Sequence, residues 1–235
     1  MPSTIQLDDI SIKIVYKNIK NMHLRVYPPD GRVQISAPRR MDLASIQRFA
    51  ASKQAWIQKS QRKIRSSPYQ APQTFQTGET HYLWGKSYKL QLNAADKPPL
   101  VEVLGDTLVL TLRAPSTIAK REQLIQSWYR SELRLRALPL IENWEKILQV
   151  KVTRLYLRRM KSRWGSCNYN KASIRLNTEL AKRPSRSLEY VIVHEMVHLL
   201  EPSHNKRFKS LMSQYLVNWK ELKDELNGPI GKSKS

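Results

Sequence analysis

Hydrophobic and polar residues alternate over several short stretches in the first half of the chain. This period of two predicts β-strands that are buried on one face. Turn-forming residues separate the stretches: Pro28-Pro29-Asp30-Gly31 joins two of them, and Gly105-Asp106 joins two others. The predicted strands are 10–16, 24–27, 33–36, a short stretch around Tyr82, 88–92, 101–103 and 108–112.

Three other stretches carry apolar residues three and four positions apart, which is the spacing of one face of an α-helix. The first extends to about Lys63, and Asp42 is a suitable N-cap for it. The second covers 115–148, with a kink expected at Pro139. The third covers 208–222. Together with the strands, these helices predict a fold of the α+β class.

A further helix is expected around residues 188–200, where the chain is apolar nearly all round, as is typical of a helix buried in a core. Pro184 suits its first turn and Pro202 ends it. Within it, His194-Glu195-Met196-Val197-His198 places two imidazoles one turn apart on the same face, where both can bind one metal ion. Glu195 lies on the same side, and it can take a proton from a water bound to that metal.

A third imidazole, His204, follows the helix break. Three neutral nitrogens and a water would complete the tetrahedral site of a catalytic zinc ion, with one zinc per chain. Two alternatives remain open at this point. The histidines of a buried helix can be hydrogen-bonded core residues, or the zinc can be structural, which usually requires a fourth side-chain ligand; the only cysteine, Cys167, is far away in sequence.

Six short motifs, one of which is the histidine pattern itself, occur along the chain. They are Val33-Gln34-Ile35-Ser36-Ala37-Pro38, Trp56-Ile57, Ser162-Arg163-Trp164-Gly165-Ser166-Cys167, Ile174-Arg175-Leu176-Asn177, His194-Glu195-Met196-Val197-His198 and Leu200-Glu201-Pro202-Ser203-His204-Asn205. Over most of its length the chain therefore resembles the YgjP-like metallopeptidases, which are related to the SprT-like zinc proteases. This resemblance implies a zincin fold, with His194, His198 and His204 as zinc ligands and Glu195 as general base. It implies little about the substrate.

Three residues beside the predicted turn Asn168-Tyr169-Asn170-Lys171 are candidates for substrate binding: Arg163, Trp164 and Tyr169. The alternative for Trp164 is a packing role, because buried aromatic residues usually pack. Strands are expected on both sides of this turn, at 152–160 and 172–176.

Charge points to a second class of partner. The chain has 41 Lys and Arg against 19 Asp and Glu, a net charge of +22, so polyanions will attract it. Residues 151–183 hold ten basic side chains against the single Glu179. This segment predicts binding of nucleic acid or another polyanion near the metal site, with Arg158, Arg159 and Lys161 as expected contacts. The alternative is a solvated strand face without a partner.

Composition also indicates the compartment. No stretch approaches the ~18–20 apolar residues of a membrane span, and the N-terminus has neither the basic start nor the apolar core of a secretory signal. A single cysteine excludes an intrachain disulfide framework. We therefore expect a cytoplasmic protein with no membrane span.

The predicted organisation has three parts: a β-rich N-terminal region with one long helix at 1–114, a zincin-like metallopeptidase domain with its HExxH active-site helix at 115–227, and a disordered basic tail at 228–235. The best linker candidate is 66–72, and no internal repeat is evident. The predicted function is zinc-dependent hydrolysis of a protein or peptide substrate. The alternative is a basic nucleic-acid-binding protein whose zinc site is structural.

Overall fold

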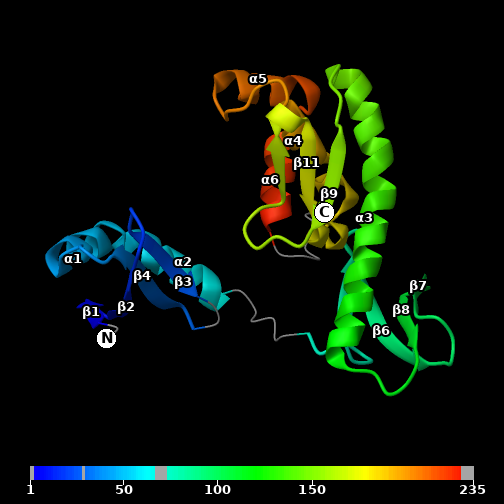
Figure 1. Ribbon diagram of the computed structural model, residues 1–235, viewed down its shortest axis with the longest axis horizontal. Helices are drawn as coiled ribbons and strands as arrows, with labels where there is room; N and C mark the ends of the chain where they lie inside the picture. Colours follow the sequence, from blue (N-terminus) through cyan, green and yellow to red (C-terminus); the bar gives the residue numbers. More distant parts are fainter. Residues whose placement is uncertain (1–2, 28–29, 67–72, 229–235) are drawn as a thin grey trace. The chain divides into compact units, whose positions relative to one another are not determined.

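The computed structural model describes residues 3–27, 30–66 and 73–228 (Figure 1). Most of the predicted linker and nearly all of the predicted disordered tail lie outside these residues. Contacts divide the chain into two compact units, Met1–Gln73 and Thr74–Ser235. Each unit is described by itself.

Unit 1 is a four-stranded sheet covered by two helices. Its strands run in the order β1-β2-β4-β3, in which β2 and β4 are parallel and the outer pairs are antiparallel. The apolar face of the sheet, including Ile14 and Ile35, shares a buried core with Ile46 and Ile57 of the helices. The elements are β1 (Ser3–Leu7), β2 (Ile10–Lys17), β3 (His23–Tyr27), β4 (Arg32–Pro38), α1 (Leu43–Ser52) and α2 (Gln54–Ser66).

The alternating pattern located three of these four strands, and the helical spacing located the helical region. Two details differ from the prediction. Strand β1 was not predicted, and the predicted single helix is two helices that meet at Lys53, whose N–H bonds to Ala50 O at 3.0 Å. Asp42 is the N-cap of α1, as predicted: its carboxylate accepts the Ser45 N–H at 2.7 Å.

Unit 2 begins with a second four-stranded sheet of the same topology. Its order is β5-β6-β8-β7, and again the inner pair is parallel and the outer pairs are antiparallel. In chain order, a helix follows the last strand of each four-stranded sheet: α1 follows β4, and a long helix follows the second sheet. The sequence shows no repeat, but the structure contains one at the level of strand order. The strands are β5 (Thr80–Leu83), β6 (Lys86–Ala94), β7 (Leu100–Leu104) and β8 (Thr107–Leu112).

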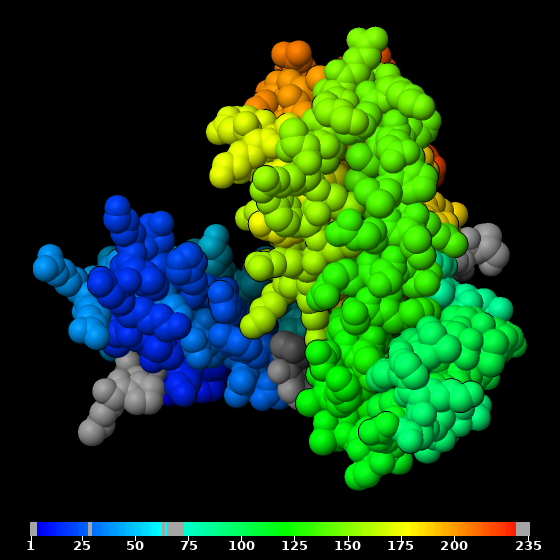
Figure 2. Space-filling model, turned by 45° about the vertical axis from the view of Figure 1, so that its right-hand side comes forward, coloured from blue at the N-terminus to red at the C-terminus, as the bar shows by residue number. Residues whose placement is uncertain are grey.

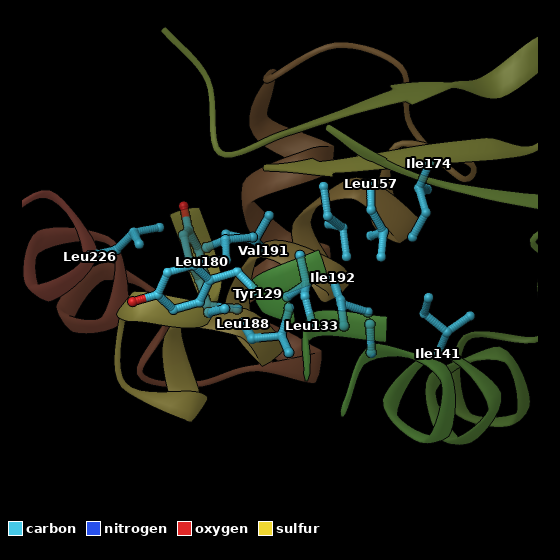
Figure 3. Close-up of a cluster of buried hydrophobic side chains, with 14 of the residues drawn as sticks. Tyr129, Leu133, Ile141, Leu157, Ile174, Leu180, Leu188, Val191, Ile192 and Leu226 are labelled. Atoms are coloured by element: carbon cyan, nitrogen blue, oxygen red, sulfur yellow. The ribbon is translucent and has the colours of Figure 1, made fainter. Parts of the chain in front are cut away.

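Helix α3 (Ile118–Leu148) joins this sheet to the rest of unit 2. It continues through Pro139, and Thr117 is its N-cap. Leu108 and Leu110 of the sheet share one core with Leu133 of α3 and Ile192 of the later helix α4 (Ser185–Val197). Figure 3 shows side chains of this core meeting between α3, α4 and the neighbouring strands. Because one core spans both sides of residue 114, the observed division falls after Gln73 and not at the predicted boundary.

A three-stranded sheet, ordered β10-β11-β9, packs against α4 and α3. Strand β11 pairs with β9 in parallel and with β10 in antiparallel orientation. The prediction missed β10, because Gly165-Ser166-Cys167-Asn168 contains no β-branched or aromatic residue. The strands are β9 (Arg154–Arg158), β10 (Gly165–Asn168) and β11 (Ser173–Asn177), with the short 3-10 helices η1 (Tyr169–Lys171) and η2 (Thr178–Lys182) after β10 and β11.

The C-terminal helices are shorter than predicted. Helix α4 ends at Val197, before Pro202, because the N–H groups of Leu199 and Leu200 bond to carbonyls three residues earlier, at 2.9 Å each. The predicted helix 208–222 is two helices, α5 (Lys206–Tyr215) and α6 (Trp219–Asn227). Among the described residues, no helix combines the length and the apolar character that a membrane span requires.

Candidate metal centre

Three histidines converge at the end of α4. His194 lies in its last turn, His198 is the C-cap residue, and His204 comes from the loop that leads to α5. His194 and His198 are four positions apart, so they project from the same side of the chain. The helix beneath them is held by a buried core that includes Val193 and Met196.

The ring nitrogens of these histidines face one another. His204 Nε2 lies 3.0 Å from His194 Nε2 and 3.1 Å from His198 Nε2. One ligand atom from each residue falls within 4.8 Å of the others. In a tetrahedral site with Zn–N bonds of about 2.0–2.1 Å, two nitrogens lie about 3.3 Å apart. The cluster therefore has the size of a site for one zinc ion.

The protonation states of the rings suit a metal. Burial lowers the pKa of His194 to about 3, and burial also lowers the pKa of His198, so both rings are neutral at pH 7. The Nδ1 atom of His198 lies 3.1 Å from Glu201 O; donating a proton there leaves the Nε2 lone pair free to face the other rings. Phe208 packs against all three rings, at centroid distances of 5.0, 4.6 and 4.7 Å.

Glu195 lies beside the cluster and is 5% exposed. Burial raises its pKa to about 8, and the positive charge of Arg163 opposes this shift. A nearby cation would favour the ionised carboxylate further. Its side chain lies against the backbone of β10: a Cβ atom on Gly165 would lie 2.5 Å from Glu195 Oε1. Only glycine fits at position 165 while Glu195 holds this position.

The cluster opens into a cleft of about 570 Å³. All three predicted substrate-binding residues, Arg163, Trp164 and Tyr169, line this cleft, together with Glu195 and the histidines. The structure also places two polar residues of α6 there, Lys223 and Asn227, beside Leu226. The sequence contains no signal for these two, because α6 reaches the cleft only through tertiary packing.

Trp164 is half-buried and links the cleft to the end of α6. Its Nε1 donates to Asn227 Oδ1 at 3.2 Å, and the guanidinium of Arg183 lies 5.1 Å from its ring centroid. Arg183 in turn donates to Gly228 O at 2.6 Å. Trp164 thus has a packing role and is also part of the cleft wall.

Two other potential ligands do not join the cluster. Cys167 lines the cleft, but among the described residues the group of convergent donors contains the three histidines alone. Burial raises the pKa of the Cys167 thiol to about 11. The Glu201 carboxylate accepts hydrogen bonds from the backbone N–H and hydroxyl of Ser203, at 3.2 and 3.0 Å.

The basic segment 151–183 does not converge on the cleft. Of its ten basic residues, Arg163 lines the cleft, while Lys151, Arg159 and Lys182 pair with carboxylates. Of these ten residues Arg163 alone lines the cleft, so the prediction that the basic segment borders the metal site is supported at that residue only.

Comparisons with known proteins bear on this site. A family model described as YgjP-like, metallopeptidase domain, matches residues 20–228. Similar solved structures include two metallopeptidase zymogens, abylysin of Pyrococcus abyssi and jannalysin of Methanocaldococcus jannaschii, each 19% identical to this chain over 38% of its length. The matches cover 90% and 86% of those chains, with TM-scores of 0.36 and 0.35. No curated protein matches.

Proposed function

This chain belongs to the YgjP-like metallopeptidase family, and we propose that His194, His198 and His204 hold one zinc ion while Glu195 serves as general base for peptide hydrolysis. The observation that carries the proposal is the convergence of three histidine ring nitrogens beside a buried carboxylate. On this proposal unit 2 is a zincin-like domain and α4 is its active-site helix.

The donor set favours zinc. Neutral imidazole nitrogens suit zinc better than they suit magnesium or calcium, which prefer oxygen ligands. Three protein ligands with an open cleft on one side are typical of a catalytic zinc site, because the remaining position stays available. When bound, zinc would polarise the scissile carbonyl and make water a stronger nucleophile.

The chain's own residues then have distinct tasks. Glu195 accepts the proton of the attacking water on a carboxylate oxygen and delivers it to the leaving amine. Its burial keeps competing solvent away from that proton. Gly165 keeps room for the carboxylate, and Arg163 supplies a positive charge that favours its ionised form.

Substrate binding is assigned to the cleft wall. Strand β10 is at an edge of its sheet and lines the cleft with Gly165, Ser166 and Cys167. An extended peptide could therefore add to this edge through main-chain hydrogen bonds. Trp164 and Tyr169 would contact the side chains of that peptide.

Metal analysis of the purified protein, combined with digestion of a peptide library read by mass spectrometry, tests the proposal. We expect one zinc per chain in the wild type and in Glu195→Gln, which should lose peptide cleavage by a factor on the order of 10³. His204→Ala should lose zinc, whereas His23→Ala, at an exposed position in β3, should retain both zinc and activity. Full turnover by the zinc-loaded Glu195→Gln variant would remove Glu195 from the mechanism.

Gly165→Ala tests the geometry separately. The added methyl group must displace the Glu195 side chain, and a misplaced catalytic group costs on the order of 10²-fold in rate. Zinc content should be unchanged, since Gly165 is not part of the histidine cluster. Gly105→Ala is the control for a glycine replacement away from the cleft: its Cβ would meet no atom within 4 Å, and its φ of +59° confines the cost to local backbone strain, which thermal unfolding measures separately from activity. Equal activity of Gly165→Ala and wild type would contradict the proposed position of Glu195.

The alternative of a structural zinc site is less well supported. A structural site usually has four protein ligands, whereas the described residues bring together three histidines and leave one side open to the cleft. If the site were structural, removing zinc would unfold unit 2 and the zinc-loaded protein would cleave no peptide in the library.

A further inference from the structure

The outer face of the three-stranded sheet carries a row of arginines around an exposed tyrosine. On β9, Arg154, Tyr156 and Arg158 are exposed and alternate with Leu155 and Leu157, which pack into the core. This alternation is that of a strand with one face in solvent. Tyr156 is 41% exposed, although tyrosine is more often buried or half-buried.

The neighbouring strand extends this surface. Arg175 of β11 pairs in register with Tyr156, is exposed, and places its guanidinium carbon 5.7 Å from the centroid of the Tyr156 ring. The two flanking residues of β11, Ile174 and Leu176, are fully buried on the opposite face. Figure 2 shows side chains of this part of the chain, yellow-green to yellow, projecting from the surface beside α3.

No ion pair accounts for these arginines. Within the described parts of the chain, Arg154, Arg158 and Arg175 have no carboxylate within salt-bridge distance, whereas the adjacent Arg159 contacts Glu122 and Glu179. Three unpaired positive charges on one small sheet repel one another, so the surface favours an anionic partner. The structure therefore separates Arg158, which belongs to this surface, from Arg159, which does not.

We propose that this surface, formed by Arg154, Tyr156, Arg158 and Arg175, binds single-stranded nucleic acid. The arginines contact backbone phosphates, and Tyr156 stacks on a base. An exposed aromatic ring among arginines distinguishes a single strand from a duplex, because the bases of a duplex are stacked on one another and offer no free face. The surface lies on β9 and β11, and β10, which pairs with the other side of β11, lines the cleft, so a strand bound there lies beside the cleft. The inference does not depend on the proposed peptidase activity.

Fluorescence anisotropy with a labelled oligothymidylate of about 12 nucleotides tests the stacking contact. Tyr156→Ala should weaken binding by about tenfold, the loss typical of one stacked base. Tyr16→Ala is the control, because it removes another exposed tyrosine, in unit 1, without touching this surface. Equal affinities for the two variants would overturn the proposal.

A salt series tests the phosphate contacts. Replacing Arg154, Arg158 and Arg175 together by Gln should reduce the slope of log K against log salt by about 2, since each contact with a single strand contributes about 0.7. The control replaces Arg130, Arg134 and Lys146 by Gln; these exposed residues of α3 carry the same charge, so net charge falls equally. Equal effects of the two triple variants would show attraction by net charge alone and would overturn the proposal.

A duplex of the same length is the competitor. The proposal expects it to bind more weakly than the single strand, and it expects Tyr156→Ala to leave duplex binding unchanged. Tighter binding of the duplex than of the oligothymidylate would overturn the single-strand assignment. Thermal unfolding and zinc content should match the wild type in every variant, because all the replaced side chains are exposed.

Discussion

The two four-stranded sheets have the same strand order and the same pairing directions, but their apolar faces are covered in different ways. In unit 1 the short helices α1 and α2 close the core, and the core ends there. In unit 2 the sheet is covered by α3, a helix of 31 residues that extends beyond the sheet and packs against α4. Strand topology alone therefore does not decide whether a sheet forms a separate unit. In this chain, the length of the helix that follows the sheet decides whether the sheet forms a separate unit.

Helix length has a direct geometric meaning. At 1.5 Å per residue, α3 is about 46 Å long and α1 about 15 Å. Buried residues occur along α3 from Ile125 to Leu148, and the helix contacts β7 of the sheet as well as α4 and β9. Figure 1 shows this helix passing from β6 and β8 to β9 within unit 2. The proposed metal site thus depends on the second sheet through α3.

Matched core truncations should produce the largest difference between the two units. Leu133→Ala in α3 and Ile35→Ala in β4 each remove a fully buried side chain and should each cost about 3 kcal/mol of unfolding free energy. Hydrogen exchange measured by mass spectrometry should show that Leu133→Ala loosens both the second sheet and α4, whereas Ile35→Ala loosens unit 1 alone. Zinc affinity should fall only in Leu133→Ala. Faster exchange in α4 after Ile35→Ala would contradict the independence of the two cores.

Acid should destabilise unit 2 specifically. His81 of β5 is 2% exposed, and burial lowers its pKa from 6.5 to about 4, with a smaller effect of Lys182 in the same direction. Between these two values the unfolded chain binds a proton that the folded chain does not, so stability is lost as pH falls. The expected loss from pH 7 to 5 is about 2 kcal/mol.

Urea unfolding of wild type and His81→Gln over this pH range measures the effect. The variant should show a flatter pH dependence, because glutamine does not titrate. In unit 1 the described histidine, His23, is exposed, so hydrogen exchange there should change less. An unchanged pH dependence in His81→Gln would assign the acid sensitivity to other groups.

Removing a helix cap from each unit should give the smallest difference in stability between them. Asp42 accepts hydrogen bonds from both the N–H and the hydroxyl of Ser45 at the start of the ten-residue α1, so Asp42→Ala should destabilise unit 1 by about 1 kcal/mol. Thr117→Ala should cost unit 2 about 0.5 kcal/mol, since Thr117 makes a longer bond, 3.2 Å, and the first turn of a long helix can fray. Thermal unfolding, monitored by hydrogen exchange in each unit, measures the two losses of stability. A larger loss for Thr117→Ala than for Asp42→Ala would contradict this prediction.

The sequence by itself determined the features that depend on neighbouring residues. Alternation predicted seven of the eight strands in the two four-stranded sheets, and the side-chain chemistry of Asp42 predicted the start of α1. The spacing of His194 and His198 placed two rings on one side of α4, and the motif that includes His204 predicted the third. Periodicity and capping act over a few residues, which is why they located the strands, the start of α1 and the first two histidines; His204 was identified by its motif.

Only the tertiary structure decided features that depend on residues far apart in the chain. Strand β10 has a weak local signal and exists because β11 supplies its hydrogen-bond partners. Lys223 and Asn227 line the cleft because α6 packs against α4. Likewise, the division of the chain falls after Gln73 because α3 merges the second sheet with the core around α4. Burial and pairing depend on partners that local patterns do not specify, and the shape of the site depends on both.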